Sequence, residues 1–161
     1  RTTIAPTGTI SLMAGASSGV EPVFALCFQH HGLEGAIKER FVNPIFEQVA
    51  RERGFYTDAI MDEVAAHGSC QGVDGVPVDV QRVFVTANHI KPEWHIRMQA
   101  AMQRFVDNAI SKTVNAPAEA TTDDIAKAYM LGWKLGCKGL TVYRSGSREH
   151  QVLACSHVQS C

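Results

Sequence analysis

Hydroxyl-bearing and small residues cluster near the start of the chain, in a run that reads Pro6, Thr7, Gly8, Thr9, Ile10 and Ser11. Residues 2–4 favour an extended strand, the proline ends that strand, and the small residues after it allow a tight turn into a helix. Amides at a helix start lack intrahelical partners and carry the positive end of the helix dipole, and the hydroxyls add further donors. These donors could bind an anion, and phosphate is the obvious ligand.

The same run also has a purely structural interpretation. Threonine and serine before an apolar stretch are ordinary helix N-caps, and Gly8 can supply a turn conformation. The lysine and the wider glycine spacing of a Walker-type phosphate loop are both absent. Local chemistry therefore leaves phosphate binding and a simple helix start as two open interpretations.

Thiols and imidazoles are the other reactive groups. Five cysteines, at positions 27, 70, 137, 155 and 161, are an odd number in a chain of this size, which argues against a disulfide framework. Cys27 and Cys137 have apolar or small neighbours and are expected to be buried and inert. His30 and His31 lack further ligands at a suitable spacing, so the sequence predicts a turn there and no metal site.

Composition excludes several classes of protein. The chain has 161 residues, of which 45% are hydrophobic and 19% charged, as in an ordinary globular domain. A formal net charge of −1 provides no overall field for nucleic acid or an anionic membrane surface. No targeting segment and no window long enough to span a bilayer is evident, so we expect a cytoplasmic protein that binds neither nucleic acid nor membrane.

The elements that must position these residues alternate between helices and strands. Apolar spacing and capping residues predict helices over 43–53, 57–67, 92–109 and 121–136, and β-rich runs predict strands over 20–28, 111–115 and 140–144. In the helix that begins at Pro92, the longest expected, Trp94, Met98 and Phe105 are predicted to face the core and His95 to lie elsewhere. Residues 69–78 are predicted to form a mobile loop. This order predicts an α/β architecture in which helices cover short strands of a sheet or barrel.

Three separated segments together resemble one known family. They read IAPTGTIS with SSGVEPVFAL, then HIRMQAAMQRFVDNAISKTVN, then LGCKGLTVYRSGSREHQVL. In this order they are similar to the C-terminal part of the catalytic barrel of adenosylcobalamin-dependent (class II) ribonucleotide reductase. The resemblance implies that residues 1–153 are the C-terminal portion of a ten-stranded α/β barrel.

The resemblance also implies roles for individual residues. It assigns the loop Pro6, Thr7, Gly8, Thr9, Ile10 and Ser11 to the phosphates of a ribonucleotide substrate. Glu21 matches the segment after that loop, where we expect a carboxylate that stabilises a turn. In the family, the radical cysteine, its helpers and the active-site redox pair precede the phosphate loop, and nothing here matches them. The resemblance therefore implies no catalytic residue in this chain, and an isolated chain that is inactive.

Cofactor and partners follow from the same resemblance. The family replaces the ribose 2′-hydroxyl by hydrogen through a thiyl radical that adenosylcobalamin generates, so adenosylcobalamin is the expected cofactor of the complete enzyme but not of this chain alone. The expected partner is the N-terminal part of the reductase barrel, which carries the radical cysteine. A barrel without its early strands would also expose unpaired edges.

Residues 154–161 are predicted to form a flexible tail that ends in a cysteine pair. A terminal cysteine pair re-reduces the active-site disulfide in the family, which implies a redox shuttle for Cys155 and Cys161 and a thioredoxin-like reductant as a partner. The pair is spaced more widely than the family's usual arrangement, and an incidental exposed tail is the alternative interpretation.

Two other functions compete with the reductase fragment. One is a non-catalytic nucleotide- or phosphate-binding module that retains the loop without the radical chemistry. The other is a metal-binding interaction protein that would use the two adjacent histidines together with Cys155, His157 and Cys161. The presence of a partner chain with the radical cysteine separates the enzyme from the binding module, and stoichiometric zinc would favour the metal-binding protein.

Overall fold

The computed structural model describes residues 1–31 and 37–147, which fall into two compact units. The sheet unit contains residues 1–22 and the described residues from 87 onward, and the hairpin unit contains the described residues between 23 and 86. Within the described residues, no helix is both long and apolar enough to cross a bilayer.

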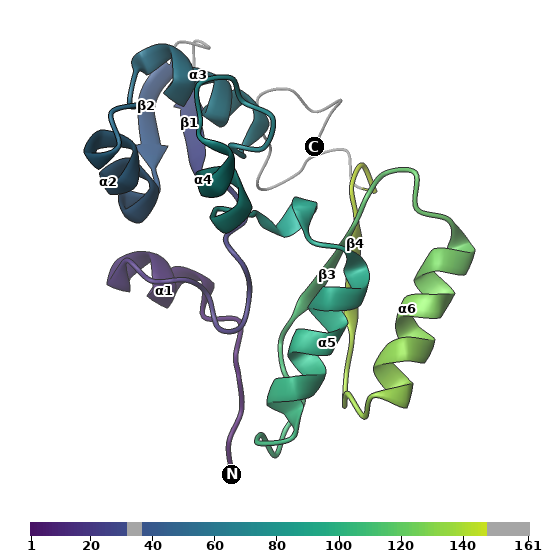
Figure 1. Ribbon diagram of the computed structural model, residues 1–161. Coiled ribbons are helices and arrows are strands. Elements are labelled where there is room, and N and C mark those ends of the chain that lie inside the picture. The colour runs from purple at the N-terminus through teal and green to yellow at the C-terminus, as the bar shows by residue number, and fades with distance from the viewer. Residues whose placement is uncertain (32–36, 148–161) are drawn as a thin grey trace. The chain divides into compact units, whose positions relative to one another are not determined.

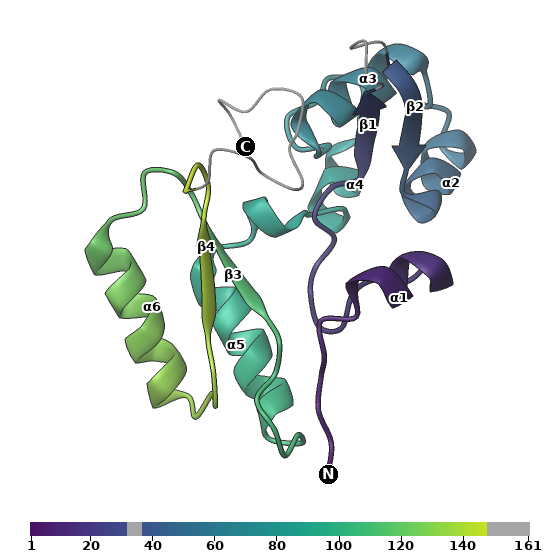
Figure 2. The same ribbon diagram turned by 180° about the vertical axis from the view of Figure 1, so that it is seen from behind.

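The sheet unit is built on two parallel strands, β3 (Thr113–Ala116) and β4 (Thr141–Arg144). The helix α6 (Thr122–Lys134) connects them, and α5 (Pro92–Gln103) packs beside α6, as the two ribbon views show (Figures 1 and 2). Ile96, Val114 and Ala128 form the buried centre between the helices and the strands. The short helices α1 (Gly8–Ala14) and η1 (Ala87–His89) complete the unit.

The first residues of the chain lie beside the same sheet. Ile4 forms an isolated parallel bridge with Ile110, and the backbone N–H of Ser111 donates to the carbonyl of Ile4 at 3.0 Å. Of the strand expected over residues 2–4, only this single β-bridge at Ile4 is formed. This bridge places the run that starts at Pro6 next to the segment that leads into β3.

Local capping explains why α6 begins where it does. The Thr121 hydroxyl accepts from the backbone N–H of Asp124, and the Asp124 carboxylate accepts from the backbone N–H of Thr121, which together make a capping box. Further along the helix, an added Cβ at Gly132 would lie 3.3 Å from Leu140, next to β4. The capping box confirms the helix start expected at residue 121.

The hairpin unit consists of an antiparallel pair, β1 (Cys27–His31) and β2 (Ile37–Val42), with three helices. These are α2 (Pro44–Glu52), α3 (Asp58–His67) and α4 (Val78–Val83). Asn43 caps α2 by accepting from two backbone amides, and the buried Phe46 packs against Phe55 and Phe84 with ring centroids 6.1 and 5.2 Å away. The expected helices over 43–53 and 57–67 are thus confirmed.

Three expectations about these elements are wrong. His30 and His31 lie in β1, since pairing with β2 supplies backbone hydrogen bonds that a local pattern does not reveal. The expected mobile loop at 69–78 is packed, because Val73 and Val76 are buried and the Gln81 side chain bonds three of its backbone groups. Among the described helices, the longest is α6 rather than α5, which ends at Gln103.

The buried face of α5 is the opposite of the expected one. Trp94, Met98 and Phe105 are 60%, 53% and 80% exposed, whereas the buried side chains are His95, Ile96, Gln99, Ala100 and Gln103. The glutamines are buried because neighbouring turns need donors. Gln99 donates to the carbonyl of Gly139 at 2.6 Å, and Gln103 donates to the carbonyls of Val106 and Asn108 at 3.0 and 2.8 Å.

The close approach at Gly132 gives a test of this packing. We expect Gly132→Leu to lower the free energy of unfolding of the sheet unit by about 1–3 kcal/mol, because the added side chain would overpack against Leu140. Ala126→Leu, at an exposed position of the same helix, is the matched control and should change it by less than about 0.5 kcal/mol. Both tryptophans, Trp94 and Trp133, lie in the sheet unit, so tryptophan fluorescence during urea denaturation reports on this unit. Equal effects of the two substitutions would contradict the packing.

Candidate functional site

The run Pro6–Ser11 forms a loop that ends in the first turn of α1. The first helical hydrogen bond runs from the backbone N–H of Ser11 to the carbonyl of Thr7 at 2.9 Å. The amides of Gly8, Thr9 and Ile10 precede that bond, so the helix gives them no acceptor. All three residues are exposed, and an added Cβ at Gly8 would meet no atom within 4 Å. The loop therefore presents accessible backbone donors.

Thr7 adopts a strained backbone conformation at the centre of this loop. Its φ of 51° lies in the left-handed region, and within the described residues it is the one non-glycine residue with a positive φ. Such a conformation costs roughly 1–3 kcal/mol and persists where surrounding contacts hold it. One such contact is the hydrogen bond from the backbone N–H of Gly19 to the Thr7 hydroxyl oxygen, at 2.9 Å.

The two other hydroxyls of the run lie in different surroundings. Ser11 is buried, its hydroxyl donates to the carbonyl of Gly8 at 2.8 Å, and it lies 2.8 Å from the Ser18 hydroxyl. Thr9 is exposed. The Ser11 side chain thus stabilises the helix start and the segment at 15–21, here called the return segment, while Thr9 is accessible to a ligand.

A buried lysine lies where the return segment meets β3. The Lys112 side chain is 1% exposed, and its ammonium donates to a carboxylate oxygen of Glu21 at 2.6 Å and to the carbonyl of Thr113 at 2.5 Å. The other Glu21 oxygen accepts from the backbone N–H of Thr113 at 2.5 Å. The carboxylate therefore bonds to a distant strand, whereas we expected it to stabilise a local turn.

His95 completes this cluster from α5. Its Nδ1 lies 2.8 Å from the Lys112 ammonium, which has only donors, so Nδ1 accepts and Nε2 donates to the carbonyl of Ala87 at 3.0 Å. This arrangement assigns the neutral form with the proton on Nε2. Burial, together with the Lys112 charge, lowers the pKa of His95 below its ordinary value. Burial likewise lowers the pKa of Lys112, and the Glu21 carboxylate opposes that shift.

The described cysteines are not in a reactive environment. Cys70 is fully buried and Cys137 half-buried, and burial raises the pKa of both thiols. A raised pKa keeps a cysteine as the thiol, which is neither a strong nucleophile nor a metal ligand. Among the side chains that the structure describes, no three histidine, cysteine or carboxylate groups are placed to hold a metal ion. Cys155, His157 and Cys161 lie outside the described residues.

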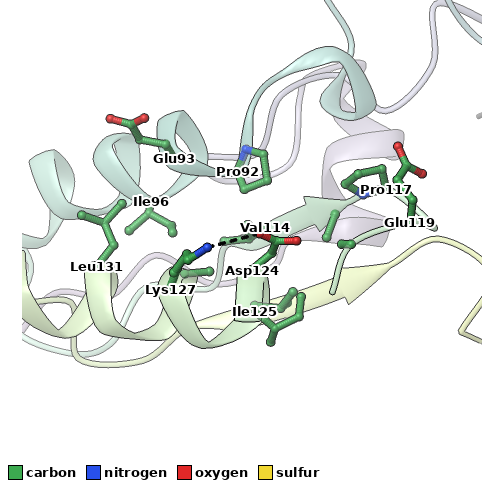
Figure 3. A pocket seen from close by; sticks show the side chains of 14 residues that line it. Pro92, Glu93, Ile96, Val114, Pro117, Glu119, Asp124, Ile125, Lys127 and Leu131 are labelled. Atoms are coloured by element: carbon green, nitrogen blue, oxygen red, sulfur yellow. Dashed lines mark ion pairs between the residues drawn. The ribbon is translucent and has the colours of Figure 1, made fainter. Parts of the chain in front are cut away.

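A cavity of about 390 Å³ lies between α5, α6 and the two strands (Figure 3). Its walls are mainly apolar and include Ile96, Val114 and Leu131. Three of its four charged residues are already paired: Glu93 forms an ion pair with Arg97, and Asp124 forms one with Lys127. The cavity therefore lacks the convergent polar groups that the loop at Pro6–Ser11 has.

Comparisons with known proteins identify the family. A family model described as ribonucleotide reductase, barrel domain, matches residues 1–143. The chain belongs to this family. The sequence-based assignment to the ribonucleotide reductases is thus confirmed.

The relatives of this ribonucleotide reductase chain are vitamin B12-dependent proteins. It is 51% identical over 153 residues to a vitamin B12-dependent ribonucleoside-diphosphate reductase of Mycobacterium tuberculosis (strain ATCC 25618 / H37Rv), covering 95% of this chain and 21% of the relative. It is 49% identical over 152 residues to the protein of the same name from Thermoplasma acidophilum, covering 94% of this chain and 20% of the relative. The chain thus spans about a fifth of the length of these curated relatives.

A solved structure confirms the fold. The alpha subunit of the Actinobacillus ureae class Id ribonucleotide reductase superposes with a TM-score of 0.74 at 23% identity, over 88% of this chain and 26% of that one. This agrees with the expected α/β barrel portion in which helices cover short strands. Sequence reasoning missed Lys112, although an isolated lysine directly before a β-rich run was a signal that could have drawn attention to it.

The buried His95 gives a test by pH. The pKa of His95 is lower in the folded state than in the unfolded state. As the pH drops below the ordinary value of 6.5, the unfolded state therefore binds a proton before the folded state does, and the free energy of unfolding falls. A glutamine at this position would not titrate, so the stability advantage of the wild type over His95→Gln should shrink between pH 7 and pH 5. Urea denaturation followed by tryptophan fluorescence at several pH values measures this. A difference that stays constant over the range would contradict the assignment of a neutral His95.

Proposed function

We propose that this chain is part of a vitamin B12-dependent reductase that converts ribonucleoside diphosphates to deoxyribonucleotides, and that it contributes the loop that binds the substrate phosphates. The observation that carries this proposal is the 51% identity, over 95% of the chain, to a protein named as such a reductase. The diphosphate as substrate follows from the names of these relatives.

The geometry of Pro6–Ser11 supports the phosphate assignment. Amides that have no helical acceptor, an exposed threonine hydroxyl and the open space at Gly8 together provide donors that an anion can approach. The strained Thr7 fits a site that is fixed before its ligand arrives, because a relaxed loop would avoid this conformation. Pro6 sets the path of the chain into the loop, and the Thr9 hydroxyl would donate a hydrogen bond to the phosphate. Ser11 stabilises the turn through its bond to the carbonyl of Gly8.

Adenosylcobalamin would supply the radical chemistry in the complete enzyme. The cavity beside α6 holds about 390 Å³, a volume that suits a drug-sized molecule, and its walls are mainly apolar. Adenosylcobalamin is a much larger molecule, so this cavity does not fit it and we assign no cofactor contact to this chain. The contribution of the chain is to bind and orient the substrate.

Exposed apolar side chains support a partner that carries the rest of the barrel. Trp94 and Met98 on α5, Phe105 just after α5 and Trp133 on α6 are between 53% and 80% exposed. Within the described residues, β4 pairs only with β3, which leaves its other edge open. Open strand edges and apolar patches are usually covered by another part of a protein. The N-terminal part of the reductase barrel is the occupant we propose.

The loop assignment predicts the behaviour of a threonine variant. In the complete reductase with adenosylcobalamin, we expect Thr9→Ala to raise the KM for a ribonucleoside diphosphate by about tenfold, because one hydrogen bond to a charged group is lost. The measurement is deoxyribonucleotide formation under steady-state conditions. The isolated chain should form none.

A matched threonine serves as the control. Thr122→Ala changes an exposed threonine at the start of α6 and should leave the KM unchanged. An unchanged KM in Thr9→Ala would count against a role of this hydroxyl in phosphate binding. If the complete protein forms no deoxyribonucleotide with adenosylcobalamin present, the proposed reductase activity is wrong.

The terminal cysteines remain a prediction about residues outside the described ones. If Cys155 and Cys161 shuttle electrons, changing both to serine should abolish turnover driven by thioredoxin and spare turnover driven by a small dithiol, which reaches the active site directly. Comparing the two reductants in the same assay measures this. Equal turnover with both reductants would favour an incidental tail.

A further inference from the structure

The phosphate loop, α1 and the return segment form one excursion of the chain that leaves the sheet and comes back to it. At the point of departure, the bridge between Ile4 and Ile110 and the bond from Ser111 to Ile4 fix the chain beside the segment before β3. At the point of return, the Glu21 carboxylate bonds to Lys112 and Thr113. Both ends of the excursion are therefore attached to residues 110–113.

The return attachment is made by charged groups inside the protein. Burying a lysine is costly unless its charge is paired and its donors are used. Here the ammonium of Lys112 has three acceptors, from Glu21 on the return segment, Thr113 on β3 and His95 on α5. Because each bond is directional, the lysine fixes three separate segments at one point. An apolar side chain could fill the space but could not set these positions.

Contacts connect this point to the loop itself. The backbone N–H of Glu21 donates to the carbonyl of Ser18 at 2.9 Å, and the Ser18 hydroxyl lies 2.8 Å from that of Ser11. The neighbouring Gly19 donates to the Thr7 hydroxyl oxygen, and it approaches the loop so closely that an added Cβ would lie 2.8 Å from the carbonyl of Ala5. A shift of the carboxylate would therefore move the residues that hold Thr7 in its strained conformation.

We propose that Lys112 and Glu21 are positioning residues for the phosphate loop: their ion pair holds the return segment against β3 and so fixes the amides of Gly8, Thr9 and Ile10 for a nucleoside diphosphate. This inference rests on the proposed function of the loop. The Lys112 ammonium is buried and, among the described residues, bonds only within the cluster of Glu21, Thr113 and His95, so the pair acts on the loop through Ser18 and Gly19. Loss of the pair should therefore weaken recognition of the phosphates and leave recognition of the nucleoside unchanged.

Binding measurements on the complete reductase test the proposal, with cytidine diphosphate and phosphate-free cytidine as probes. We expect Lys112→Met to raise the Kd for the diphosphate by about tenfold or more and to change the Kd for cytidine by less than about twofold. Lys127→Met, at an exposed lysine of α6, is the matched control and should change neither. If Lys112 only stabilised the fold, Lys112→Met would change the Kd for the diphosphate and the Kd for cytidine by the same factor, or would change neither. A folded Lys112→Met protein with an unchanged diphosphate Kd overturns the proposal.

Glu21→Asp separates position from charge and decides the question if Lys112→Met does not fold. Aspartate keeps the charge but shortens the side chain by one methylene, so it cannot reach Lys112 and Thr113 unless the return segment moves. We expect the diphosphate Kd to rise severalfold while the cytidine Kd stays constant. A wild-type Kd in Glu21→Asp shows that reach does not matter and overturns the positioning role.

Hydrogen exchange distinguishes failure of this inference from failure of the proposed function. If the wild type binds the diphosphate and cytidine equally well, the phosphate assignment is wrong, and the exchange rates of residues 5–20 then decide the role of the pair. Faster exchange in Glu21→Asp over residues 5–20, with α6 unchanged and with wild-type rates in Lys127→Met, supports the pair as the element that fixes the loop. Unchanged exchange over residues 5–20 overturns it.

Discussion

The ammonium of Lys112 is the contact on which the geometry of the sheet unit depends. It is buried, it donates to three acceptors on three separate segments, and it is the group around which the return segment, β3 and α5 meet. A buried ammonium is tolerated only when its charge is paired and its N–H donors have acceptors. The fold must therefore bring a carboxylate, a carbonyl and a neutral imidazole to one place. Glu21 and His95 are constrained by that need, although they lie 74 positions apart in the chain.

The same need for polar partners explains the unusual interior of α5. The glutamines of this helix donate inward to carbonyls of the turns at 106–108 and 139, and Gln103 accepts from the backbone N–H of Lys138 at 3.3 Å. These turns have backbone carbonyls that the sheet does not satisfy, and the buried glutamine side chains donate to them. Because these glutamine side chains point inward, Trp94 and Met98 of α5 lie at the surface, and Phe105 just after the helix is exposed as well. An apolar outer face is consistent with a chain that spans a fifth of the length of its relatives.

Features with local causes were predictable from the sequence. The caps at Asn43 and Thr121, the close approach at Gly132 and the strands around Val114 and Val142 follow from residue types within a few positions. The strand at His30, the packed loop at 69–78 and the buried face of α5 depend on partners far along the chain. Periodicity assigns the apolar side of a helix to the core, and it fails where the core contains backbone carbonyls that need donors.

The candidate site shows the same limit, because its accessible donors could be inferred from the sequence while their support could not. A hydroxyl-rich turn before a helix marks the loop, but only the folded chain shows that Ser11 is engaged, that Thr7 is strained and that Glu21 bonds to β3. Amides and hydroxyls do not titrate near neutral pH, so their value for an anion depends on where they are held rather than on their charge state. A loop attached at both ends to one short segment, by a backbone bridge at Ile4 and an ion pair at Glu21, meets that requirement without any reactive group of its own. The thiols of Cys70 and Cys137, whose pKa is raised by burial, are consistent with the proposed role of the chain in orienting a substrate.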